Sequence, residues 1–183
     1  MIRLKDGQYQ VANAVYREVI PRVLTAARQA QIAERPAAYT LPNGSLDLPK
    51  LMRAWQAFWA EDGHIAAEGF HYREAGPHLM LMAFLQRILN GGGRIFREYG
   101  LGRGALDILV EWGNERHAIE VKLRRDTRTE GRAIEQLGRY LDASGLNEGW
   151  PVLFDLRTDV SWEDKLQMRD VSYEGKLIHI VGC

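Results

Sequence analysis

The feature that most constrains the fold is a pair of strand-like segments, residues 104–112 and 115–123, separated by Gly113-Asn114. A two-residue turn of this composition between alternating apolar segments is typical of a β-hairpin. The turn also sets the register, because Trp112 must then face Glu115, and every other opposed pair follows from that one. The sequence therefore predicts an antiparallel pair of strands with defined partners.

The register gives the predicted hairpin two different faces, since side chains alternate along a strand. A slip of one residue would expose Ile119 and Val121 and bury Glu120 and Lys122, so the apolar pattern protects the register. The expected apolar face pairs Val110 with His117, Ile108 with Ile119 and Leu106 with Val121; the expected polar face pairs Glu111 with Arg116, Leu109 with Ala118, Asp107 with Glu120 and Ala105 with Lys122.

The pairing of Asp107 with Glu120 is the chemical anomaly of the hairpin. Opposed like charges destabilise a sheet and raise the pKa of one partner. A hard cation removes the conflict, and magnesium prefers one or two carboxylates together with waters and phosphate oxygens. Lys122 follows on the same face, where its ammonium can hold a phosphate oxygen or an attacking water. An isolated D-x12-E-x-K match is weak evidence, and a solvated sheet face without a role is the competing interpretation.

The other periodic segments complete an α/β pattern with a mixed central sheet. Residues 129–143 predict a crossover helix, and the glycines at 91–93 end another helix that contains residues 81–89. The apolar stripe at 48–59 is interpreted as packing. Further strands are expected at 94–99, 151–156 and 176–181, with a small hairpin at 2–11 and a loop at 36–49.

Three stretches, GRGALD, HAIEVK and IEQLGRY, resemble the PD-(D/E)XK nuclease superfamily over about residues 64–160. The run YREAGPHLMLMAFLQRILNGGGRIFREYGLGRG is similar to the C-terminal nuclease-like domains that follow an AAA-type ATPase domain in some prokaryotic proteins. The resemblance implies a restriction-endonuclease-like core with a mixed central sheet flanked by helices, plus an N-terminal helical appendage. We expect a boundary between a post-ATPase, winged-helix-like region at 1–63 and a nuclease-like domain at 64–183.

The resemblance also implies roles for individual residues. Asp107 and Glu120 would be metal ligands, Lys122 the catalytic lysine, and Glu74 a third acid that completes a site for Mg²⁺ or, in its place, Mn²⁺. Gln136 and Tyr140, four residues apart on one helix face, would orient the site. Leu106 departs from the family pattern, because it stands where the motif has its proline, and Ala14 stands where the related segment has a proline after asparagine.

The charge balance limits how the chain can contact nucleic acid. Lysine plus arginine equals aspartate plus glutamate at 24 each, so a phosphate-binding surface must be local. The region after the hairpin has such a bias, although a solvated loop is an equal alternative. The candidate nucleic-acid-binding residues are Arg103, Arg124, Arg125, Arg128 and Arg132.

These observations predict a magnesium-dependent nuclease acting on DNA. No phosphate-cradling G-x4-G-K-[ST] motif occurs, so an AAA-type ATPase partner would lie elsewhere in a longer protein or in another chain. The alternatives are a non-catalytic nucleic-acid-binding or docking module of such an ATPase, or a regulatory or oligomerisation domain if the aromatic helix at 48–59 is exposed. The lone cysteine, Cys183, and the lack of a long apolar run favour a cytoplasmic protein without a membrane span.

Overall fold

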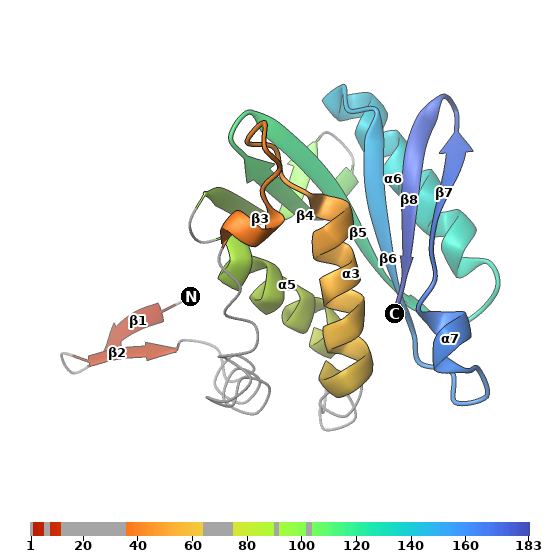
Figure 1. Ribbon diagram of the computed structural model, residues 1–183, viewed down its shortest axis with the longest axis horizontal. Coiled ribbons are helices and arrows are strands. Elements are labelled where there is room, and N and C mark those ends of the chain that lie inside the picture. The colour runs from red at the N-terminus through yellow and green to blue at the C-terminus, as the bar shows by residue number, and fades with distance from the viewer. Residues whose placement is uncertain (1, 6–7, 12–35, 64–74, 90–91, 102–103) are drawn as a thin grey trace.

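The computed structural model describes residues 2–5, 8–11, 36–63, 75–89, 92–101 and 104–183 (Figure 1). Its elements in chain order are β1 (Ile2–Lys5), β2 (Gln8–Val11), η1 (Pro36–Tyr39), α3 (Leu48–Phe58), η2 (Trp59–Gly63), α5 (Ala75–Leu89), β3 (Gly93–Leu101), β4 (Gly104–Trp112), β5 (Glu115–Arg124), α6 (Thr129–Ser144), β6 (Glu148–Asp155), α7 (Trp162–Lys165), β7 (Met168–Tyr173) and β8 (Lys176–Gly182).

The main sheet has six strands in the order β3-β4-β5-β6-β8-β7. Strand β4 pairs antiparallel with both β3 and β5. Strand β6 pairs parallel with both β5 and β8, and the edge strand β7 pairs antiparallel with β8. Helix α6 is the crossover between the parallel strands β5 and β6. The expected α/β fold with a mixed central sheet flanked by helices is therefore confirmed.

The central hairpin has the register that its turn predicts. Trp112 pairs with Glu115, and the ladder continues to Ile108 opposite Ile119. Gly113 lies in the left-handed region with φ of 56°, which a primed hairpin turn requires and which glycine adopts without strain. The expected ladder pair of Asp107 with Glu120 does not form, because the paired part of the hairpin ends one step before it.

Both faces of the hairpin are covered, which differs from the single apolar face that we expected. Helices α3 and α5 cover the face with Ile108 and Ile119, and α6 covers the face with Leu109 and Ala118 (Figure 1). Leu106 joins the cluster beneath α6, whereas its expected partner Val121 lies in the other cluster. Alternation therefore predicts the two faces of β4 from Ile108 to Trp112 but not at Leu106, and the placement of the helices decides whether a face is buried.

Helix α3 is part of the main core. Trp55 and Trp59 are 0% and 1% exposed, and both rings contact Phe154 of β6 edge-on. Gln56 donates a hydrogen bond to the carbonyl of Gly182 at the end of β8. The aromatic stripe is packing, as interpreted, and its burial removes the basis for an oligomerisation domain built on an exposed aromatic face.

The N-terminal hairpin forms a separate two-stranded sheet with the expected partners, Ile2 with Val11 and Leu4 with Tyr9. The boundary after residue 63 stays a prediction, because residues 12–35 and 64–74 lie outside the described parts of the chain. Within the described ranges, no helix has the length and apolarity that crossing a bilayer requires.

Two elements near the C-terminus were missed, and strand β6 begins earlier than expected. The short helix α7 has no buried residue, and strand β7 buries little apolar surface because it lies at the edge of the sheet. Strand β6 begins at Glu148, three residues before the expected start at Pro151. Proline usually marks a strand start or edge; here the β6–β8 ladder skips Trp150 and Pro151, which accommodates the missing N–H inside a central strand.

Candidate active site

The candidate site lies where β4 and β5 separate. Beyond the last ladder pair, the Asp107 side chain takes over as hydrogen-bond acceptor, and Oδ2 receives the N–H of Val121 at 2.8 Å. The same oxygen lies 3.8 Å from Nζ of Lys122. Asp107 is thus fixed to the neighbouring strand by its carboxylate, while its side chain keeps 26% of its surface exposed.

Glu120 is the buried member of the site, with a side chain that is 0% exposed. Its Oε1 accepts a short hydrogen bond from Nζ of Lys122. Its Oε2 is buried and accepts no hydrogen bond from the described residues, and a hydrogen bond between the Glu120 and Asp107 carboxyls requires one of them to be protonated. A carboxylate oxygen without a partner in a dry environment costs free energy, so this atom is where a positively charged ligand would have the largest stabilising effect.

Lys122 bridges the two acids from the exposed side. Its side chain is 29% exposed, and its ammonium contacts both Glu120 and Asp107. One positive charge therefore faces two carboxylates, and the cluster is short of one positive charge when both are ionised. The three residues come together as the hairpin register predicts, although through side chains and not through a ladder pair.

The electrostatic consequence falls on Glu120. Burial, reinforced by repulsion from Asp107 and opposed by the hydrogen bond and charge of Lys122, raises the pKa of Glu120 from 4.5 to about 7. The expected rise of one carboxyl pKa is thus present, with desolvation as its largest cause. Near neutral pH this carboxyl is poised between its two protonation states, which is a common property of functional sites.

The residues present fit a hard divalent cation that takes only one or two ligands from the protein. Two adjacent carboxylates, one with an unsatisfied buried oxygen, match the one or two carboxylates with which magnesium is usually held. No group of three or more histidine, cysteine, aspartate or glutamate side chains with metal-binding geometry occurs in the described ranges. The proposed third acid, Glu74, lies outside the described residues.

Helix α6 supplies the other two expected site residues. Tyr140 is buried in the cluster that contains Ala118 of β5, and Gln136 is half-buried one turn earlier. Both lie on α6, the helix that covers this side of β4, β5 and β6. Their orienting roles stay predictions.

The candidate nucleic-acid-binding arginines follow the site along the chain. Arg124 ends β5 and lies two residues beyond Lys122, which places both on the same side of the strand. Arg125 and Arg128 are exposed in the turn before α6, and Arg132 is 65% exposed with Nη1 at 3.9 Å from Oδ2 of Asp126. Arg103 lies outside the described residues.

Sequence reasoning missed a second charged cluster beside these arginines. Asp155, the last residue of β6, is the parallel neighbour of Arg124 and binds the guanidinium of Arg157 through both carboxylate oxygens. The motif DLR in the sequence has no distinctive spacing. The one available signal is that an apolar strand ends at an acidic residue. Acidic side chains are rarely buried without a partner, so this position predicts a nearby basic residue.

Fold and site together define an α/β protein with a central mixed sheet and an acidic-lysine cluster at its hairpin. The chain belongs to the family described as a domain of unknown function, DUF8371, whose model matches residues 50–158. None of the curated proteins matches the chain.

A solved structure of SfsA from Pyrococcus furiosus in complex with Ca²⁺ is similar over part of its length. The sequence identity is 21%, and the alignment covers 45% of this chain and 44% of that chain, with a TM-score of 0.31. The chain thus spans less than half of that protein. An overlap of this size does not establish a shared fold.

Proposed function

We propose that the protein is a metal-dependent nuclease of the PD-(D/E)XK type that hydrolyses phosphodiester bonds in DNA, with Mg²⁺ as the metal and Mn²⁺ as a substitute. The observation that carries the proposal is the buried carboxylate of Glu120 beside Asp107, with one oxygen unsatisfied and Lys122 on the open side. A charge-deficient acid pair of this kind is costly to the fold and fits a site that gains a cation.

In this proposal Asp107 and Glu120 hold the metal, and Glu74 adds a third oxygen ligand. When bound, magnesium would polarise the phosphate and lower the pKa of a water molecule. The cation would also release Lys122 from neutralising both acids. Its ammonium, on the exposed side of the site, would then contact a phosphate oxygen and stabilise the negative charge that develops there.

The remaining expected residues act around this centre. Gln136 and Tyr140 would orient the site or the scissile phosphate from α6, and Arg103, Arg124, Arg125, Arg128 and Arg132 would contact the nucleic-acid backbone. An AAA-type ATPase, in the same longer protein or in another chain, would be the partner that brings DNA to the site. Binding to an ATPase is tested separately from cleavage, by co-purification of the two proteins.

The test is cleavage of supercoiled and linear DNA with and without Mg²⁺ or Mn²⁺. Asp107→Asn and Lys122→Ala are expected to abolish the metal-dependent activity, whereas Glu111→Gln, further along the same strand, serves as the matched control. Circular dichroism confirms that the variants are folded. If both site variants cut as well as the parent, the activity lies elsewhere or belongs to a contaminant.

A non-catalytic docking module is the second candidate, and one observation favours it. Lys122 already contacts both acids, so the cluster is partly closed on itself without any ligand. A docking module would bind DNA or its ATPase partner unchanged by Asp107→Asn and would show no cleavage with either metal. The two candidates therefore differ in the same assay.

A further inference from the structure

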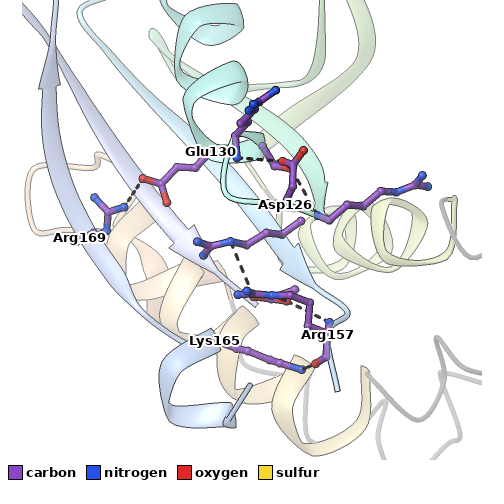
Figure 2. Close-up of polar contacts among 10 residues, drawn as sticks. Asp126, Glu130, Arg157, Lys165 and Arg169 are labelled. Atoms are coloured by element: carbon purple, nitrogen blue, oxygen red, sulfur yellow. Dashed lines mark hydrogen bonds and ion pairs between the residues drawn. The ribbon is translucent and has the colours of Figure 1, made fainter. Parts of the chain in front are cut away.

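A second charged cluster stands at the carboxyl ends of the parallel strands β5 and β6, the edge where open α/β sheets commonly bind ligands. The Asp155 side chain is 4% exposed, so its carboxylate is buried at the end of β6. Arg157 binds this carboxylate through one edge of its guanidinium group: Nε lies 2.9 Å from Oδ1, and Nη2 lies 2.6 Å from Oδ2. Figure 2 shows Arg157 beside Lys165, whose ammonium donates to the Arg157 carbonyl.

This two-point contact with Asp155 fixes the direction of the Arg157 guanidinium group. Because Nε and Nη2 face the carboxylate, the planar geometry of the group turns Nη1 away from it. The side chain keeps 36% of its surface exposed, so the group is held on one edge and open on the other. Burial acts to raise the pKa of Asp155, but the hydrogen bonds and charge of Arg157 outweigh it and hold that pKa below its ordinary value.

Arg124 adds a second guanidinium group to the cluster. Its Nε lies 4.0 Å from Oδ2 of Asp155, beyond hydrogen-bonding distance, and is buried without a hydrogen-bond partner among the described residues. Arg157 neutralises Asp155 and also interacts with the charge of Asp159, whereas the buried Nε of Arg124 is left without an acceptor in the described part of the chain. An anionic ligand would accept a hydrogen bond from this donor.

The neighbouring arginines are engaged differently. Arg169 pairs with Glu130, and Figure 2 shows the two side chains pointing toward each other. Arg132 pairs with Asp126 near the start of α6. In these pairs one acid meets one base, whereas beside Asp155 the Nε of Arg124 is buried without an acceptor among the described residues.

We propose that Arg124 and Arg157, arranged around the buried Asp155 carboxylate, form a binding site for a backbone phosphate of the nucleic acid adjacent to the scissile one. The inference rests on the proposed function, in which the scissile phosphate contacts Lys122. Lys122 and Arg124 are separated by two residues of β5, about 6.6 Å at the usual strand rise. That separation is comparable to the distance between neighbouring phosphates along one strand.

Asp155 and Lys165 are positioning residues in this arrangement. Asp155 orients the guanidinium group of Arg157, and Lys165 fixes the backbone of Arg157. Neither group needs to touch the nucleic acid.

The test is the binding of a duplex oligonucleotide, measured by fluorescence anisotropy in EDTA at several salt concentrations. Arg157→Gln and Arg124→Gln should each weaken binding about tenfold, the order expected for a lost hydrogen bond to a charged group. Each should also reduce the slope of log affinity against log salt by about 0.9, the value for one lost phosphate contact. Arg139→Gln, an exposed arginine in the middle of α6, is the matched control and should change neither quantity.

Arg157→Lys distinguishes two-point hydrogen bonding by the guanidinium group from attraction by its charge alone, because lysine keeps the charge but cannot bind two oxygens side by side. It should keep the salt slope of the parent while losing affinity. Thermal melts confirm that each variant is folded, and if one glutamine variant unfolds, the other and the lysine variant decide the matter.

The outcomes separate this inference from the proposed function. If the parent binds and cleaves DNA and both glutamine variants bind as tightly as the parent, the phosphate site is wrong while the nuclease stands. An equal loss in Arg139→Gln would show general electrostatic attraction and would also refute the site. A parent that binds no duplex in EDTA refutes the phosphate site alone, because the proposed nuclease holds the scissile phosphate through its metal and is decided by cleavage with Mg²⁺ or Mn²⁺.

Discussion

The pH dependence of stability offers a direct test of the Glu120 environment. In the folded protein its pKa lies at about 7, against 4.5 as an ordinary value. Between these pH values the folded state keeps a proton that the unfolded chain has released. Stability from this group is therefore present below pH 4.5 and is lost as the pH rises toward and through 7.

The size of the effect follows from the same values. A pKa unit corresponds to about 1.4 kcal/mol, so the rise at Glu120 removes about 3 kcal/mol from the free energy of unfolding between pH 4.5 and 8. Glu120→Gln cannot titrate and should flatten the pH profile by that amount. Groups with lowered pKa values, such as Asp155, act in the opposite direction, but they are present in both proteins and cancel in the comparison.

The assay is urea unfolding in EDTA at pH 5, 6, 7 and 8 for the parent, Glu120→Gln and the exposed-residue control Glu135→Gln. The parent and the control should lose stability relative to Glu120→Gln as the pH rises. Parallel pH profiles for the parent and Glu120→Gln would refute the buried, repelled carboxyl on which the site is built.

Three further outcomes test the site and the packing. Saturating Mg²⁺ should stabilise the parent by about 2.7 kcal/mol at a hundredfold excess over Kd, more at pH 8 than at pH 5; an equal response in thermal melts of Asp107→Asn would place the metal elsewhere. Trp55→Ala should cost about 3–5 kcal/mol in urea unfolding, and a loss below 1 kcal/mol would contradict α3 as part of the core. Gly138→Ala should destabilise the protein by about 1–3 kcal/mol because its Cβ would lie 2.7 Å from the Tyr173 ring. Gly131→Ala, with open space around it, should stabilise α6 by up to about 1 kcal/mol. Equal shifts of the melting temperature in the two variants would disprove the contact with Tyr173.

Much of the fold was predictable because the strongest signals are local. The Gly113-Asn114 turn fixes the hairpin register through Ile108 and Ile119, and helical periodicity places α6 and α3 within a few residues of their observed ends. The same turn places Asp107, Glu120 and Lys122 at one end of two adjacent strands, but their contacts form through side chains beyond the last ladder pair.

The tertiary structure decided what local patterns cannot encode. Alternation distinguishes the two faces of β5, but only the packing of the folded chain around Glu120 buries this side chain and raises its pKa to about 7. The edge strand β7 escaped because it buries little apolar surface. The Asp155 cluster joins residues from two strands that are parallel neighbours through a long crossover, and nothing in the separate segments shows that Arg124 and Asp155 become adjacent. Burial and long-range pairing are properties of the assembled chain, and the chemistry at both clusters depends on them.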